Sequence, residues 1–180
     1  NAGYDHSLGP SVESLWNLEG LFGLEPPPGV DRNLQADGFS ERGPAVGTLV
    51  DYDFDAALLG VPARHQGYGN LYYLNDGGRD NLGLGRRSLA VPDENRGRAL
   101  WRHRSDALGM GRWVAAELGF LSDRNFLEQY YEQDWDRDKD YETLVGVNHQ
   151  VDNLTVSGLA RGRLNDFENQ TNWLPRADLT

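Results

Sequence analysis

Residues 143–162 alternate between apolar and polar side chains, and a turn signal interrupts them once, at Asp152-Asn153. One side of the alternation is apolar: Val145, Val147 and Val151. The other side is small or polar: Gly146, Asn148 and Gln150. A period of two indicates β-strands, and a polar turn pair between two such runs indicates a tight hairpin. This segment must therefore fold as an antiparallel sheet whose two faces differ in polarity.

The length of this turn fixes which residues face each other across the hairpin. A two-residue loop predicts three facing pairs: Val151 with Leu154, Val147 with Gly158, and Val145 with Ala160. A slip of one residue would place Val147 against Ser157 and would mix the two faces. We therefore expect the register that keeps the faces separate.

Segments with similar alternation occur throughout the rest of the chain. They include residues 10–24, 44–54, 65–74, 98–104 and 112–121. The length of 180 residues suits a single domain. For residues 1–180 we predict an all-β fold, an antiparallel meander of about eight or nine strands.

The phase of the alternation divides the strand side chains into two sets. The apolar set is Val46, Val50, Val114, Leu118, Val145 and Val147. The polar set is Asp51, Asp53, Arg98, Arg102, Glu117, Asn148 and Gln150. Across a turn at 105–110, parity predicts facing residues whose numbers sum to 215, which places Arg98 opposite Glu117 and Arg102 opposite Trp113.

The connections between the expected strands alternate in length. Residues 75–97 and 122–141 are long, 105–111 and 152–153 are short, and 164–172 is intermediate. Long loops at one end of a sheet and short turns at the other are typical of outer-membrane barrels. No stretch approaches 18 consecutive apolar residues, which excludes a transmembrane helix, whereas a transmembrane strand needs only about 9–11 residues.

Charge and composition limit the classes of partner and site. The formal net charge of −11 argues against a nucleic-acid partner. The chain has no Cys, so it holds no disulfide and no thiolate metal site.

Acidic side chains suggest two kinds of chemistry. Four alternate aspartates resemble a calcium loop: Asp134, Asp136, Asp138 and Asp140. An EF-hand that starts at Asp134 needs Gly and Glu where this chain has Lys139 and Val145, so a solvated acidic loop is the favoured interpretation and a looser calcium site stays open. Carboxylates such as Asp51, Asp53 and Glu117 would suit a glycosidase, but nothing in the sequence fixes their separation. We expect no enzyme activity, cofactor or metal ion.

Several runs of residues resemble one bacterial family. The most specific are SDRNFLEQYY at 122–131 and DFENQT–WLPRADL at 166–179, and FSERGPAVG at 39–47 and RGRALWRHR at 96–104 follow in the family's order. They are similar to the barrel domain of the LPS-assembly protein family LptD, also called organic solvent tolerance protein OstA. The similarity covers roughly residues 34–180.

This resemblance implies a segment of a large transmembrane β-barrel in the bacterial outer membrane. The implied function is translocation of lipopolysaccharide, or a related glycolipid, to the outer leaflet. The implied partners are a lipoprotein plug (LptE-like) in the lumen and a periplasmic bridge component (LptA-like). The apolar set would then face lipid and the polar set the lumen. Because only the early part of a barrel is covered, we expect an open curved sheet in which residues 10–24 do not pair with 173–180.

The arginines of the polar set have two readings. Arg98 and Arg102 would either form a basic lumen strip that attracts glycolipid phosphates, or only neutralise Glu117. Two other classes of protein also stay open. One is a self-contained eight-stranded outer-membrane barrel that acts as a pore, adhesin or enzyme, and the other is a soluble β-sandwich that binds a ligand through its loops.

Overall fold

The computed structural model describes residues 1–83, 85–107, 111–137, 141–167 and 171–180. In chain order its elements are β1 (Ala2–Asp5), β2 (Gly9–Asn17), α1 (Leu18–Phe22), β3 (Val30–Phe39), β4 (Gly43–Leu58), β5 (Val61–Asn75), β6 (Arg79–Asp80), β7 (Leu89–Ala90), β8 (Asn95–Ala107), β9 (Arg112–Leu121), α2 (Phe126–Tyr130), α3 (Glu132–Arg137), β10 (Thr143–Val151), β11 (Leu154–Gly162) and β12 (Trp173–Leu179). None of the helices in these ranges is long and apolar enough to cross a membrane.

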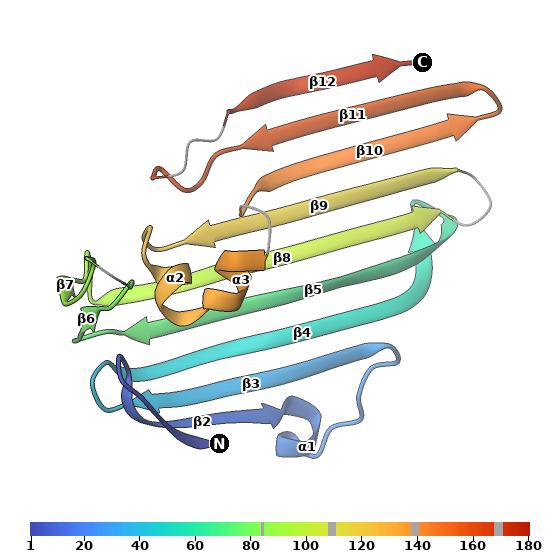
Figure 1. The fold of residues 1–180 in the computed structure, drawn as a ribbon. Helices are drawn as coiled ribbons and strands as arrows, with labels where there is room; N and C mark the ends of the chain where they lie inside the picture. Colours follow the sequence, from blue (N-terminus) through green and yellow to red (C-terminus); the bar gives the residue numbers. More distant parts are fainter. Residues whose placement is uncertain (84, 108–110, 138–140, 168–170) are drawn as a thin grey trace.

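Ten strands form one antiparallel sheet in the order β1-β2-β3-β4-β5-β8-β9-β10-β11-β12 (Figure 1). The strands β6 and β7 pair separately as a short ribbon inside the long connection from β5 to β8. Neighbours in the large sheet follow one another along the chain, which confirms the predicted all-β meander. The predicted strand number is too low, because β1 adds a short strand at the N-terminal edge, in a segment without alternation.

The sheet is open. Within the described residues β1 and β12 are its two edges, and no pairing joins β1 or β2 to β12. The prediction that the first and last strands do not pair is therefore confirmed.

The hairpin of β10 and β11 has the predicted register. Val151, Val147 and Val145 face Leu154, Gly158 and Ala160. The turn residue Asp152 has a φ of 50°, in the left-handed region that Asp tolerates better than most residues because its short side chain can bond locally.

The predicted register of β8 and β9 is wrong by four residues. Arg102, not Arg98, faces Glu117, and Arg98 faces Leu121. The strands run on to Ala107 and Arg112, so residues 105–107 belong to β8 instead of the turn. A shift of four keeps every side chain on its face, so parity alone cannot distinguish the two registers. The middle of this turn, residues 108–110, lies outside the described residues.

The strand expected over residues 10–24 ends at Asn17, and residues 18–22 form α1. The Asn17 side chain accepts a hydrogen bond from the Gly20 amide at 2.9 Å, which starts the helical turn. Gly23 ends it with a φ of 64°.

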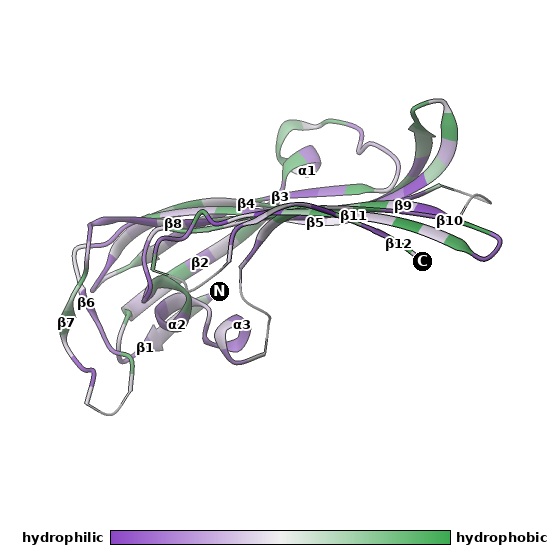
Figure 2. Cartoon of the chain, turned by 90° about the horizontal axis from the view of Figure 1, so that it is seen from above, coloured by the Kyte–Doolittle hydropathy of each residue, from purple (hydrophilic) through white to green (hydrophobic). Residues whose placement is uncertain are grey.

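The two sets of strand residues lie on opposite faces of the sheet, as predicted. Facing residues of antiparallel neighbours share a face, and Val50 is linked to Leu118 through Gly69 and Trp101 in this way. Seen almost edge-on, the sheet is a shallow arch, with α2 and α3 on its hollow side and α1 on the other side (Figure 2). The polar set lies on the side of α2 and α3, because Tyr131 and Asp134 contact Arg98 there.

The buried core lies on the polar face, between the strands and α2. Its members are Phe39, Ala45, Tyr72, Leu74, Leu100, Leu121, Phe126, Leu127 and Tyr141. This explains the apolar side chains that interrupt the polar alternation near the long loops. The opposite, apolar face has no comparable cover among the described residues, and Val46, Leu118, Val145 and Val147 are between 37% and 49% exposed there.

The β5–β8 pairing makes a testable prediction at Gly67. A Cβ at this position would overlap the carbonyl oxygen of Arg102 and the hydroxyl of Tyr52, so Gly67→Ala should lower the free energy of unfolding by about 1–3 kcal/mol. Gly38 also lies in a strand, but a Cβ there meets nothing within 4 Å. Gly38→Ala should therefore change stability by less than about 1 kcal/mol. Urea unfolding of both variants tests the pairing, and equal losses would contradict it.

Candidate functional site

The polar face carries a row of side chains that crosses six strands. In order across β3, β4, β5, β8, β9 and β10 it contains Asp31, Asp51, Tyr68, Arg102, Glu117 and Leu144. The row places two predicted residues in direct contact: Arg102 Nε lies 3.3 Å from Glu117 Oε2. Arg102 also donates to the Tyr68 hydroxyl at 2.7 Å. The predicted ion pair with Glu117 therefore exists, but with Arg102 in place of Arg98.

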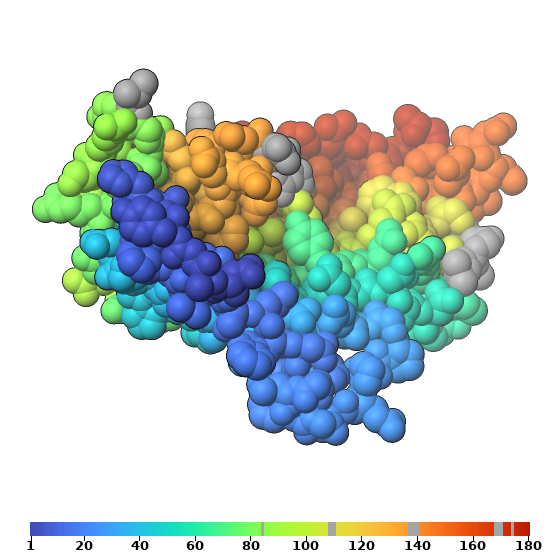
Figure 3. Space-filling model, turned by 60° about the horizontal axis from the view of Figure 1, so that its bottom comes forward, coloured from blue at the N-terminus to red at the C-terminus, as the bar shows by residue number. Residues whose placement is uncertain are grey.

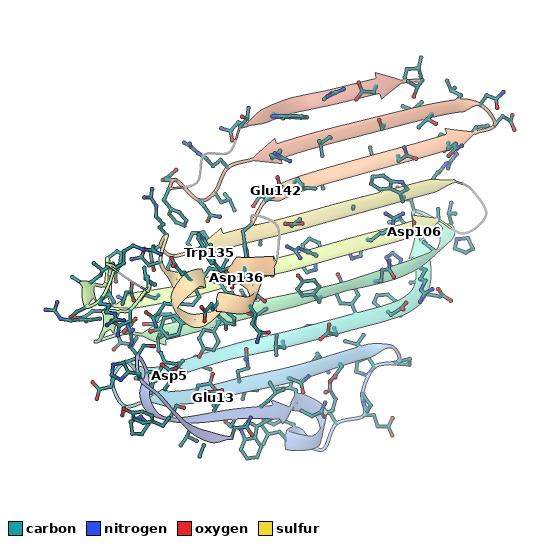
Figure 4. The ribbon with its side chains drawn as sticks, viewed as in Figure 1. Asp5, Glu13, Asp106, Trp135, Asp136 and Glu142 are labelled. Carbon is teal, nitrogen blue, oxygen red and sulfur yellow. The ribbon has the colours of Figure 1, made fainter. Side chains whose placement is uncertain are left out.

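Arg98 is held by the segment between β9 and β10 instead. Its guanidinium donates to Asp134 at 2.7 Å and to the Tyr141 hydroxyl at 2.8 Å, and it lies 3.4 Å from the centre of the Tyr131 ring. Burial raises the pKa of the Tyr131 hydroxyl to about 12, although Arg98 acts in the opposite direction. A neutral ring therefore covers the arginine at physiological pH. Figure 4 shows α3, with Trp135 and Asp136, in front of the sheet.

Arginines elsewhere on this face are also paired with acids. The pairs are Arg64 with Asp53, Arg104 with Asp106, Arg161 with Glu142, and Arg176 with Asp178. Asp31 and Asp51 add further negative charge to the row. The polar face is therefore a network of ion pairs without an excess of positive charge, which favours the neutralising reading of the arginines over a basic strip.

The remaining predicted polar residues lie toward the short turns. Asp51, Asp53 and Gln150 are exposed, and Asn148 is half-buried next to Trp113 of β9. On this face Asp51 is separated from Glu117 by Tyr68 and Arg102, so the structure does not place these two carboxylates next to each other.

Sequence reasoning missed a group of buried charges at the long-loop end, here called the Arg96 cluster. It contains Arg42, Asp76, Asp80, Arg96 and Asp123, whose side chains are all at least nine-tenths buried. Arg96 donates to Asp76, Asp80 and Asp123 at 2.7–2.9 Å. Arg42 lies 3.2 Å from Asp80. Two cations and three carboxylates leave a formal charge of −1, which α2 covers.

Two aromatic rings of α2 pack on the guanidinium of Arg96, at 5.7 Å for Phe126 and 5.5 Å for Tyr130. The Tyr130 hydroxyl donates to Asp76 at 2.6 Å. Burial alone raises the pKa of Asp76, but the bonds from Tyr130, the Gly78 amide and Arg96 outweigh it, and its pKa stays below the ordinary value. Asp76 is therefore a charged partner for the arginines at neutral pH.

The Arg96 cluster folds the long connections inward over the polar face. Further contacts act in the same direction: Gln129 bonds to Ser7 at 3.0 Å and to the Asn81 amide at 2.8 Å. In Figure 3, the orange region of α2 and α3 lies next to the green segment before β8, and the dark blue N-terminal segment borders both. Asn165, from the connection after β11, bonds to Leu121 and Gly119 at the end of β9. The sequence pointed to part of the Arg96 cluster, because Asp123 and its neighbour Tyr130 belong to the run at 122–131 that the sequence analysis singled out.

The acidic run at 134–140, for which a solvated loop is the favoured interpretation and a looser calcium site stays open, is only partly described. Asp134 lies in α3 and binds Arg98, and no group of three or more possible metal ligands occurs in the described ranges. Asp138 and Asp140 lie outside those ranges.

The apolar face also carries a series of hydrogen-bonded side chains. It lies near the β4–β5 hairpin, which curls away from the sheet (Figure 2). The indole N–H of Trp101 donates to the Tyr52 hydroxyl at 2.9 Å. Tyr52 contacts Nδ1 of His103 at 2.7 Å, and Nε2 of His103 contacts Ser105 at 2.7 Å. Ser105 contacts Nδ1 of His65 at 2.8 Å. The histidine rings are stacked 5.8 Å apart.

Donor chemistry gives this chain a direction. The indole N–H can only donate, so the Tyr52 hydroxyl accepts from it, and we assign the hydroxyl proton onward to Nδ1 of His103. His103 must then carry its proton on Nε2 and donate it to Ser105, which donates to Nδ1 of His65. In this direction Nδ1 accepts in both histidines, which assigns the ring proton to Nε2, and Nε2 of His65 ends the series of hydrogen bonds without a hydrogen-bond partner among the described residues.

The Arg96 cluster makes a prediction about stability. Arg96→Met would leave three buried carboxylates with Arg42 alone, and should cost about 3–5 kcal/mol of unfolding free energy. Arg104→Met is the matched control, because its pair with Asp106 is about two-fifths exposed, and it should cost at most about 1 kcal/mol. Urea unfolding measures both, and similar losses for the two variants would contradict the structural role of the cluster.

The hydrogen-bond chain makes a prediction about tautomers. Long-range proton–nitrogen NMR spectra should show His65 and His103 as Nε2–H tautomers at neutral pH. In Trp101→Phe the donor that sets the direction is absent, so His103 should populate the Nδ1–H form. An Nδ1–H form of His103 in the unmodified protein would overturn the assigned direction.

Comparisons with protein-family models and with curated proteins find no match to this chain.

Proposed function

We propose that this chain is part of an outer-membrane β-barrel that carries lipopolysaccharide, or a related glycolipid, to the outer leaflet. The apolar face contacts the bilayer, and the polar face lines the path of the sugar and phosphate groups. The role is transport and not catalysis. A lipoprotein plug and a periplasmic bridge component are the partners that the sequence resemblance implies for it.

One observation carries the proposal: within the described residues, a single ten-stranded meander leaves most of its apolar face uncovered, while α2 and the long connections fold onto the polar face. A protein in water would expose Val46, Val145 and Val147 on that face at a cost, because about 25 cal/mol is lost per Å² of apolar surface left in water. Lipid removes this cost. The backbone groups of consecutive strands are paired with one another, as the bilayer interior requires.

The connections support the same arrangement. Among the described residues, 76–83, 85–94, 122–137 and 163–167 lie at one end of the sheet, and the turns at 59–60 and 152–153 lie at the other (Figure 1). Two connections near the N-terminus depart from this division: the connection 18–29, which contains α1, lies at the short-turn end, and the short turn 40–42 lies at the long-loop end. Outer-membrane barrels have long extracellular loops and short periplasmic turns. The long-loop end would then be extracellular.

The open sheet also bears on the alternatives. A self-contained eight-stranded barrel requires its edge strands to pair, and β1 and β12 do not. A sandwich requires a second sheet against the apolar face, and within the described residues only the short β6–β7 ribbon lies outside the large sheet. Both alternatives are therefore less consistent with this fold than a barrel segment.

Site-specific photocrosslinking tests the proposal in cells that make lipopolysaccharide. Asn148 and Val147 are neighbours in β10 whose side chains lie on opposite faces. A photoreactive residue at Asn148 should capture lipopolysaccharide, and the yield should fall when cellular energy is depleted. The same residue at Val147 should capture no lipopolysaccharide in transit.

The pair Arg102 and Leu118 repeats the test on β8 and β9, with Arg102 on the polar face and Leu118 on the apolar face. Energy-dependent capture of lipopolysaccharide from both faces, or from neither, would remove the case for a path along the polar face.

A further inference from the structure

A second apolar surface lies outside the sheet, around α1. We call it the α1 surface; its residues are Trp16, Leu21, Phe22 and Leu24, which are 52%, 48%, 65% and 55% exposed. Isolated exposed apolar residues need no explanation, but four within nine positions form a patch. The proposed transport function does not use this patch.

The α1 surface has a fixed shape. The Asn17 side chain caps the start of the helix through the Gly20 amide, and Gly23 ends the helix in the left-handed region. The Leu24 amide then donates back to the Glu19 carbonyl at 2.9 Å. Leu21, Phe22 and Leu24 are therefore presented by a closed turn that both caps hold.

The charge of the helix is hidden from this surface. Glu19 is buried, and its carboxylate accepts from Arg32 of β3 at 2.6 Å. The acid that would oppose contact with an apolar medium is therefore turned toward the sheet and paired. The helix exposes its leucine and phenylalanine side chains instead.

The α1 surface lies on the apolar side of the molecule. Figure 2 shows α1 on the side of the sheet opposite α2 and α3, and in Figure 3 it projects from the body of the molecule. Trp16 connects it to the sheet, because Trp16 faces Leu34, which faces Thr48, which faces Leu71. The α1 surface is therefore continuous with the apolar face of the strands.

We propose that the α1 surface is a membrane anchor that inserts Leu21, Phe22 and Leu24 at the boundary between lipid headgroups and acyl chains. The proposal rests on the proposed function, in which the apolar face contacts the bilayer. Trp and Phe are side chains typical of membrane interfaces. A stable protein interface needs about 800 Å² from each partner, more than one short helical turn offers, whereas lipid needs no complementary shape.

Spin labelling tests the anchor, because this sequence contains no Cys and one label can be placed at a time. Nitroxides would be attached to Phe22→Cys, to Leu118→Cys on the apolar face, and to Trp135→Cys on α3. The protein is reconstituted into phospholipid vesicles. Accessibility to oxygen, which concentrates in lipid, is compared with accessibility to a water-soluble nickel complex.

The label at residue 22 should be reached by oxygen and shielded from nickel, at a shallower depth than the label at 118. The label at 135 should be reached by nickel. In the Phe22→Cys background, Leu21→Ser with Leu24→Ser should increase nickel accessibility at least twofold, whereas Leu59→Ser at the β4–β5 turn, 97% exposed, should leave it unchanged.

The outcomes separate the two proposals. Lipid contact at 118 with nickel access at 22 would overturn the anchor and leave the proposed function in place. Nickel access at both positions would overturn both. Shielding of residue 22 from oxygen and nickel alike would mean that protein covers the α1 surface, which would also overturn the anchor.

Discussion

The alternation of side chains stays in phase across the large sheet, and the rest of the structure depends on this constraint. Each antiparallel pairing puts facing residues on one side, so a single strand out of phase would bring charges among Val114, Leu118 and Val145. The phase is kept from β3 to β11, through turns of very different length. One face therefore becomes largely apolar, with the hydrogen-bonded group around His103 and the arginines Arg32 and Arg112 as exceptions, and most ionic side chains of the strands are gathered on the other.

Because most charges lie on one face, the loops that cover this face bury charged groups, and each buried charge needs a partner. The Arg96 cluster provides these partners. Loops that fold over this face remove carboxylates and guanidiniums from water, and an unpaired buried ion is costly. Arg96 bonds to three carboxylates, and Tyr130 supplies a further donor to one of them. The inward fold of the loops is therefore stable only when residues from three separate connections meet Arg96 of β8 in the same place.

The parts that sequence reasoning predicted are those with a local rule. The two-residue turn at Asp152 allows only one register that keeps the faces apart, so the β10–β11 hairpin could be predicted residue by residue. Parity predicted the faces of β8 and β9, but a shift of four residues obeys the same rule, so the partner of Glu117 could not be fixed. The sequence of residues 18–24 is compatible with a strand or with a helical turn. The caps at Asn17 and Gly23 favour the helical turn. The Arg96 cluster has no local spacing, because its members are far apart in the chain.

Burial along the polar face then determines where a polar solute could make contact. At the long-loop end the face is closed, since Tyr72 and Leu100 are at most 6% exposed beneath α2. Toward the short turns it is open, with Asp51 and Gln150 exposed. If this face lines a transport path, sugars and phosphates meet its open part first, and the segment 122–137 stands between them and the long-loop end. The run at 122–131 lies in that segment and fastens it through Asp123. A transport role would therefore require either passage beside this fastened segment or exit from the sheet before reaching it.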